Sequence, residues 1–169
     1  MIIGVINIKG GVGKTTSSLA IATAAQRSGL SVTVVDTDPQ GSATLWAQAA
    51  EDADDPLPFP VVSKNQAEIR RMRERRPDRD GELIVIDTPP NGAVVDEAIK
   101  TADFVVIPTL SSPIDLQQTM LTAAQCQDAG KDYAVLIVLA RKGTNALRAF
   151  RTAVEEYGAG IFDTEIPQR

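Results

Sequence analysis

The sequence predicts an α/β fold: one domain, spanning residues 1–169, built on a doubly wound, mostly parallel sheet of about seven strands. Three observations predict it. Short apolar runs rich in β-branched residues alternate with helix-like segments along the whole chain. A glycine-rich loop follows the first run, and two later runs end in aspartate. Because parallel strands require crossover helices, all these strand ends should meet at one edge of the sheet.

The first unit is a strand, a loop and a helix. Residues 2–8 are apolar almost throughout, which is typical of a strand buried on both faces. Residues 14–28 carry small and apolar side chains at helical spacing and stop at Gly29, a common helix terminator. The loop between them therefore opens a helix directly after a buried strand.

That loop has the composition of a phosphate cradle. Gly10, Gly11 and Gly13 let successive backbone N–H groups point inward, and the following helix adds the positive end of its dipole. Lys14 can place its charge on the terminal phosphates of a nucleotide. The hydroxyl of Thr15 can complete the oxygen shell of a magnesium ion.

Two further strands deliver carboxylates to the same edge. Residues 31–36 form a β-branched run that ends at Asp36, with Asp38 just beyond it. In a βαβ unit with the first strand, both aspartates should lie near the phosphate cradle. Residues 82–87 are a hydrophobic run ending in Asp87, the Walker B pattern, which helps to hold magnesium, often through a water.

The rest of the chain continues the alternation. The expected elements are helices at 44–50 (with the only tryptophan, Trp46), 64–79, 93–101, 114–129 and about 144–157, and strands at 104–107, 133–140 and 160–162, with irregular connections at 51–60 and 108–113. No internal repeat is present.

The helix at 64–79 is strongly basic. Ile69 and Met72 could anchor one face and leave the basic side chains outward. This pattern fits either a solvated helix face or a patch that binds a phosphate backbone. The basic residues are Lys64, Arg70, Arg71, Arg73, Arg75, Arg76 and Arg79, set against Glu68, Glu74 and Asp78.

Composition excludes several classes. The chain has no histidine, so histidine general-base and triad chemistry is absent, and its single cysteine, Cys126, excludes an internal disulfide or multi-cysteine cluster. A net charge of −5 means that any DNA binding must come from a local patch. No apolar run is long enough to cross a bilayer, so a cytoplasmic protein is expected.

Three motifs together resemble a known family. The strict G-x-x-x-x-G-K-[ST] pattern fails at Ile8, but residues 9–16 resemble the deviant Walker A motif of the ParA/MinD ATPases, with Lys9 as its signature lysine. Residues 35–41 and 84–90 look like that family's Walker A′ and Walker B motifs. Length and residues 150–152 and 166–169 are similar to small ParA-type, ParF-like plasmid partition ATPases.

The resemblance implies a role for each matching residue. Lys9 would reach across a dimer to the partner's nucleotide, Asp38 would position the attacking water, and Thr16 would contact the α-phosphate. The implied catalytic residues are Lys9, Lys14 and Asp38. The implied nucleotide contacts are Lys9, Gly10, Gly11, Val12, Gly13, Lys14, Thr15 and Thr16, with Pro167 and Gln168 beside the adenine, and the implied Mg²⁺ residues are Thr15, Asp36 and Asp87.

The resemblance also implies a function. It predicts a P-loop NTPase that binds ATP and Mg²⁺, is a weak ATPase, forms a homodimer with ATP, binds DNA non-specifically and is stimulated by a small centromere-binding, ParB- or ParG-like partner. Such a protein would segregate a plasmid or chromosome and associate with the nucleoid. Most family members continue beyond the position of Arg169 into further helices, which are expected to be missing here.

Two alternatives are disfavoured to different degrees, and a third is excluded by the single cysteine. A MinD-like positioning ATPase would need a basic amphipathic membrane helix, and none is evident, so no stable membrane association is expected. A synthetase of the same superfamily would transfer phosphate to a substrate carboxylate, which the Asp38-Pro39-Gln40 segment disfavours. A nitrogenase-reductase-like role would need two cysteines per chain.

Overall fold

The computed structural model describes residues 1–74 and 81–168. Helices and strands alternate along these residues, as the sequence predicts. The strands are β1 (Ile2–Val5), β2 (Ser31–Asp36), β3 (Val61–Ser63), β4 (Glu82–Asp87), β5 (Phe104–Thr109) and β6 (Asp132–Ile137). The helices are α1 (Lys14–Arg27), α2 (Ser42–Asp52), α3 (Gln66–Glu74), α4 (Ala93–Thr101), α5 (Pro113–Asp128) and α6 (Asn145–Glu156).

The strands form one sheet in the order β3-β2-β4-β1-β5-β6. Every neighbouring pair is parallel, so all the strands end at the same edge. β1 lies between β4 and β5, and Asp36 at the end of β2 lies in register with Asp87 at the end of β4. The predicted doubly wound parallel sheet is confirmed, and its functional edge is the one where these strands end.

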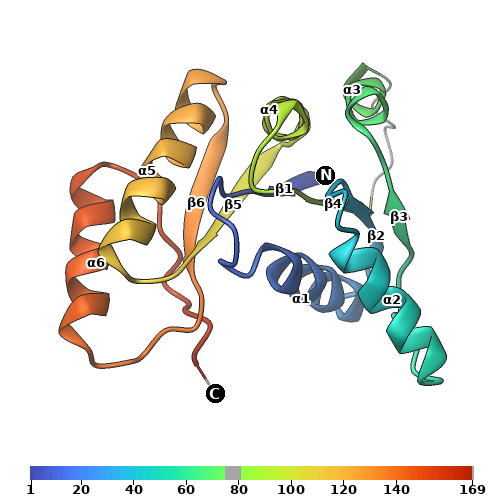
Figure 1. Cartoon of the computed structure of the whole chain (residues 1–169), viewed down its shortest axis with the longest axis horizontal. Helices are drawn as coiled ribbons and strands as arrows, with labels where there is room; N and C mark the ends of the chain where they lie inside the picture. Colours follow the sequence, from blue (N-terminus) through green and yellow to red (C-terminus); the bar gives the residue numbers. More distant parts are fainter. Residues whose placement is uncertain (75–80, 169) are drawn as a thin grey trace.

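Both faces of the sheet are covered by helices, α3 and α4 on one side and α1 and α2 on the other (Figure 1). Alternate side chains of each strand face opposite ways: Val85 packs toward α1, whereas Ile86 packs toward α4. A third cluster joins β6 to α6 and the start of α5. Burial on both faces explains why the strands are nearly continuous apolar runs in the sequence.

Across the described residues the sheet has six strands, so the expectation of about seven is corrected at residues 160–162. Only a single bridge joins Ile161 to Val135 there. The guanidinium of Arg151 donates to the carbonyl oxygens of Phe162 (2.8 Å) and Asp163 (3.2 Å), which draws this segment toward α6. Short segments with such competing partners do not extend a ladder.

Helix α3 is anchored as predicted but its charges are partly paired. Ile69 is fully buried and Met72 packs against the same core. Two arginines turn toward the buried Glu97 of α4, Arg73 at 2.9 Å and Arg70 at 3.6 Å, so they do not simply point outward. Arg75, Arg76, Asp78 and Arg79 lie outside the described residues. None of the described helices has the length and apolar character needed to cross a membrane.

Candidate functional site

The glycine loop joins the end of β1 to the start of α1. Gly11 and Gly13 adopt left-handed φ angles of 75° and 76°, which glycine reaches without the strain of a Cβ atom. Gly13 is the N-cap of α1, and its carbonyl accepts from Ser17 N at 2.9 Å. Val12 is buried and fixes the loop to the core. The first-turn amides of α1 therefore open toward the sheet edge, where an anion is stabilised.

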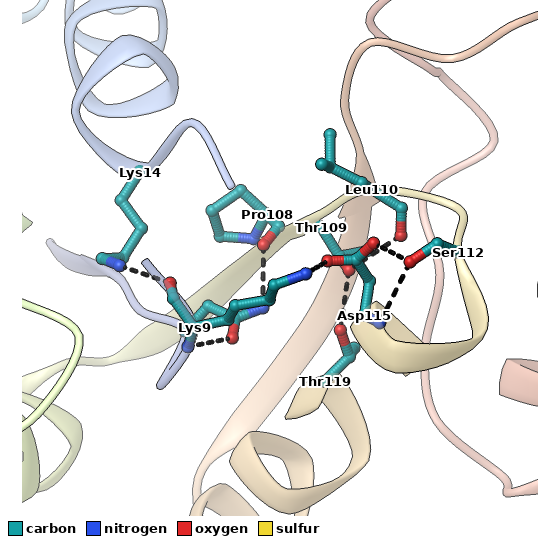
Figure 2. Close-up of polar contacts among 9 residues, drawn as sticks. Lys9, Lys14, Pro108, Thr109, Leu110, Ser112, Asp115 and Thr119 are labelled. Atoms are coloured by element: carbon teal, nitrogen blue, oxygen red, sulfur yellow. Dashed lines mark hydrogen bonds and ion pairs between the residues drawn. The ribbon is translucent and has the colours of Figure 1, made fainter. Parts of the chain in front are cut away.

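Lys14 lies in this loop with only 7% of its surface exposed. Its Nζ donates to the carbonyl oxygen of Lys9 at 2.8 Å (Figure 2). Burial lowers the pKa of Lys14, and the negative charges of Asp87 and Asp38 partly offset that effect. A desolvated ammonium that donates to a loop carbonyl is suited to donate instead to a phosphate oxygen, which is a stronger acceptor.

Asp87 is fully buried at the end of β4. Its Oδ1 accepts from Ser18 Oγ at 3.0 Å, whereas Oδ2 has no hydrogen-bond partner among the described residues. Burial raises the pKa of Asp87 to about 6, with hydrogen bonds from Thr15 and Ser18 lowering it and the charge of Asp36 raising it. The structure thus brings Thr15 and Asp87 together and leaves one carboxylate oxygen without a donor, which suits a cation.

Asp36 is buried but its carboxylate is already occupied. Oδ2 accepts from both N and Oγ1 of Thr44 at 2.9 Å, and Oδ1 accepts from Asp38 N at 3.1 Å. Asp36 therefore braces the start of α2 in this state, while lying beside Asp87 at the end of the neighbouring strand. Its predicted place near a metal stays a prediction.

A cavity of about 480 Å³ opens where the loop faces β2 and α2. Asp38 lies in its wall, and so does Trp46, half of whose surface is exposed. The lining residues are Gly10, Gly11, Gly13, Lys14, Thr15, Thr16, Asp38, Ser42, Trp46, Thr88 and Pro90. Ser42 and Trp46 were not predicted as site residues. The signal for Trp46 was its place one helical turn beyond the start of α2, just after the Asp38 turn.

Lys9 points away from this cavity. Its Nζ forms an ion pair with Asp115 of α5, and Asp115 also contacts the Ser112 hydroxyl (Figure 2). The side chain of Lys9 is 30% exposed and that of Asp115 is 2% exposed. Sequence analysis missed Asp115. The available signal was the Ser112-Pro113-Ile114-Asp115 pattern, an [ST]-x-x-[DE] helix start at the boundary between the expected loop (108–113) and the expected helix (114–129).

Pro167 and Gln168 lie beside the end of β6. Gln168 N donates to Ala140 O at 3.1 Å, and its side chain accepts from Arg141 Nε at 2.6 Å. A Cβ added at Gly13 would lie 3.5 Å from Val138, so this end of β6 adjoins the glycine loop. The two exposed residues are therefore on the correct edge for a base contact, which stays a prediction.

The donor set fits a nucleotide-bound magnesium ion better than a metal held by protein alone. No group of three or more His, Cys, Asp or Glu side chains across the described residues could hold a metal ion. Mg²⁺ commonly uses one or two carboxylates together with waters and substrate phosphates. Thr15 and Asp87, beside a phosphate cradle, supply that kind of partial shell.

A family model and several known proteins match this chain in sequence. The family model described as "CobQ/CobB/MinD/ParA nucleotide binding domain" matches residues 3–169. "Maintenance of carboxysome distribution protein A" of Halothiobacillus neapolitanus is 30% identical, over 99% of this chain and 79% of that protein. The protein of the same name from Gloeobacter kilaueensis is 34% identical over 98% and 76%, and "Protein ParA" of Rhizobium radiobacter is 28% identical over 81% and 63%.

Solved structures share the fold. The MinC:MinD cell division protein complex of Aquifex aeolicus contains a chain with a TM-score of 0.80 and 17% identity, matched over 99% of this chain and 81% of that one. Cobyrinic acid a,c-diamide synthase from Mycobacterium smegmatis, with bound ADP and magnesium, has a TM-score of 0.77 and 21% identity over 99% and 86%. At these identities the likeness concerns the fold alone.

Proposed function

The chain belongs to the CobQ/CobB/MinD/ParA family of nucleotide-binding domains, and from that membership we propose that it is an ATPase whose ATP-bound form dimerises to position a cargo. The observation that supports the proposal is that the two lysines of the loop lie in different places relative to the cavity. Lys14 faces the cavity, whereas Lys9 lies outside the residues that line it and so is placed to act elsewhere.

ATP and Mg²⁺ are the proposed ligands. Lys14 and the loop amides would hold the β- and γ-phosphates, and Thr16 would contact the α-phosphate. The Thr15 hydroxyl and Asp87 would hold Mg²⁺, which would neutralise charge on the transferring phosphoryl group. Pro167 and Gln168 would flank the adenine.

Hydrolysis would depend on two groups, one from each subunit of the dimer. Asp38, in the cavity wall, would position the attacking water. Lys9 would reach into the partner subunit and stabilise the charge that develops on the partner's nucleotide, as an arginine finger does in other nucleoside triphosphatases. A cation supplied in this way can change the rate by about 10³–10⁵, so catalysis would be weak until the dimer forms.

The names of the relatives support a proposal for the cargo. The name of one relative is ParA, and the names of two others refer to the distribution of carboxysomes. We assign this chain a plasmid or chromosome segregation role, with non-specific DNA as the track and a small centromere-binding protein as the stimulating partner. A carboxysome cargo is the second candidate, favoured by the two carboxysome-related relatives at 30% and 34% identity.

The DNA contact would come from α3 and the chain around it. Arg71 is exposed there, but Arg70 and Arg73 share Glu97 and Lys64 lies 3.7 Å from Glu68. We expect weak binding that falls with salt at a log–log slope of about −0.9 for each phosphate neutralised. A flat salt response would remove DNA from the proposal.

The central experiment measures oligomeric state and turnover together. Sedimentation of the wild type with Mg²⁺ and a non-hydrolysable ATP analogue should show a dimer, and with ADP a monomer. Lys9→Met should bind the analogue but stay monomeric and lose turnover. An analogue-induced dimer of Lys9→Met would refute the role of Lys9 in trans.

Two other outcomes would favour the alternative functions. Binding of the ATP form to anionic vesicles instead of DNA would favour the MinD-like alternative, and turnover only with a carboxylic acid substrate would favour a synthetase.

A further inference from the structure

The chain turns back after α6 and runs beside β6 (Figure 1). Two isolated parallel bridges join this returning segment to β6 and the residues that follow it, Val135 to Ile161 and Ala140 to Pro167. From Val135 to Ala140 is five steps along the chain, whereas from Ile161 to Pro167 is six. The returning segment therefore holds one extra residue between its two attachments, as a strand does at a β-bulge.

Arg151 of α6 contacts the interval that holds the extra residue. Its Nη2 donates to the carbonyl oxygens of Phe162 at 2.8 Å and Asp163 at 3.2 Å, and its Nε donates to Glu165 Oε1 at 2.7 Å. The side chain of Arg151 is 22% exposed and that of Glu165 is 14% exposed, so both charges are largely shielded from water. A planar guanidinium makes such fixed, forked contacts, which a lysine ammonium cannot reproduce.

The ladder resumes beyond this interval. The backbone N–H groups of Ile166 and Gln168 donate to carbonyl oxygens of β6 and its extension, at 2.9 Å and 3.1 Å. Pro167, which has no N–H, lies between these two donors, where none is needed. A slip of one residue would bring Pro167 into a donor position and lose a hydrogen bond. Loss of the Arg151 contacts should therefore release this segment from β6 instead of shifting it to a new register.

Pro167 and Gln168 are exposed, and they lie beside the end of β6 that adjoins the glycine loop. We propose that Arg151 is a positioning residue for the nucleotide base. It fixes residues 166–168 at that edge, and so raises affinity for the base while leaving the phosphate contacts unchanged. The inference rests on the proposed function, in which Pro167 and Gln168 flank the adenine. Arg151 is not among the described residues that line the cavity at the glycine loop.

A purely structural role for Arg151 predicts a different result. The same three contacts tie residues 162–165 to α6, so their loss would lower the free energy of unfolding. If that were the only effect, a folded variant would bind ligands with and without a base as the wild type does. The dependence of binding on the base therefore separates the two roles.

The test compares two ligands with Mg²⁺ by isothermal titration calorimetry. One is the non-hydrolysable ATP analogue, and the other is inorganic tripolyphosphate, which has the phosphates and no base. Arg151→Met should weaken binding of the analogue at least about fivefold, the lower end of typical coupling between sites, and leave tripolyphosphate affinity unchanged. Arg151→Lys should give an intermediate loss for the analogue, because a lysine can pair with Glu165 but cannot hold both carbonyl oxygens as well.

Two further variants test the same contacts. Glu165→Gln leaves the carbonyl contacts of Arg151 in place, so it should weaken analogue binding by a smaller factor, and it replaces Arg151→Met if that variant fails to fold. Together the two substitutions should weaken binding by less than the product of their separate effects, since they break one cluster of contacts. The matched control is Arg148→Met, an exposed arginine of α6 that donates to Asn145, which should bind both ligands as the wild type does.

Equal losses of affinity for the two ligands, or unchanged affinity for the analogue in the folded variants, would overturn the positioning role. If the wild type binds the analogue no more tightly than tripolyphosphate, there is no base contact for Arg151 to position. In that case the inference fails and the phosphate site stands. If the wild type binds neither ligand, the proposed function itself fails.

Discussion

The two lysines of the glycine loop lie five residues apart in the sequence and in opposite environments. Lys14 is desolvated, lies against a backbone carbonyl, and has a lowered pKa. Lys9 is partly exposed and paired with a buried carboxylate. The first arrangement desolvates an ammonium that an anion would compensate, whereas in the second the removal of Lys9 would leave a buried carboxylate without its cation. The comparison indicates that binding chemistry and structural support are separated within one short loop.

Removing the Lys14 ammonium should produce the largest effect. Lys14→Met keeps the unbranched stem, and we expect affinity for the Mg²⁺–ATP analogue to fall at least about 100-fold, because truncating one partner of a buried charged contact costs about 2–5 kcal/mol. The free energy of unfolding without nucleotide should stay the same or rise. Isothermal titration calorimetry and urea unfolding measure the two quantities.

The control for Lys14→Met is Lys100→Met, an exposed lysine near the end of α4. It should leave both quantities unchanged. A clear loss of stability in Lys14→Met would mean that Lys14, like Lys9, supports the fold, and the comparison would break.

Substitution of Asp87 should give the next largest effect, which is on the free energy of unfolding and on its pH dependence. Its folded-state pKa of about 6 lies above the reference of 3.8, so the folded state binds this proton more tightly. Its stabilising contribution is present below about pH 4 and is lost as the pH rises through about 6. Asp87→Asn should remove that slope and raise the free energy of unfolding at pH 7 by on the order of 2 kcal/mol, while weakening Mg²⁺-dependent nucleotide binding.

Urea unfolding of the nucleotide-free protein at pH 4.5 and 7.5 measures this slope. Asp128→Asn serves as the exposed control. If Asp87→Asn were less stable than the wild type at pH 7.5, the charged carboxylate would stabilise the fold. Burial of charge on the cavity side of the loop would then not lower stability.

Lys9→Met should lower stability and leave nucleotide affinity nearly unchanged, which is the reverse of Lys14→Met. Its effect should also be smaller. It leaves Asp115 buried without its cation, and we expect the free energy of unfolding to fall by about 1–2 kcal/mol, since hydrogen bonds to charged groups contribute about 1.5–3 kcal/mol and Lys9 is partly solvated. Affinity of the monomer for the ATP analogue should change by less than about threefold, because Lys9 does not line the cavity of its own subunit and indirect effects of a substitution are usually small. Equal losses of binding in the two lysine variants would contradict the division of roles.

Trp46 gives the smallest and most local test. It is the only tryptophan and lies half exposed in the cavity wall near Lys14. When Mg²⁺ and the ATP analogue fill this cavity and displace water, its fluorescence emission should shift to shorter wavelength. The shift should persist in Lys9→Met and disappear in Lys14→Met. A shift that required Lys9 would instead place Trp46 at the surface between subunits.

Much of the fold followed from local pattern. The apolar runs predicted β2 and β4 at their observed bounds, and the aspartates that end them lie in register, because neighbouring parallel strands bring their ends together. The glycines of the loop predicted a backbone free to curl, and two of the three, Gly11 and Gly13, adopt left-handed φ angles. Residues 160–162 were misassigned because a strand depends on its hydrogen-bond partners, and Arg151 binds the carbonyl oxygens of Phe162 and of Asp163, which follows it.

The sequence by itself therefore determined the sheet, the phosphate loop and the edge at which Lys14 and Asp87 meet, since each depends on local backbone preference or on where a strand ends. The tertiary structure decided which partners the other side chains around that edge contact. Lys9 meets Asp115 across 106 residues because β5 lies beside β1, and no local pattern encodes that pairing. The same packing placed Trp46 in the cavity wall and Glu97 beneath two arginines, because long-range contacts are selected by the packing of the whole core.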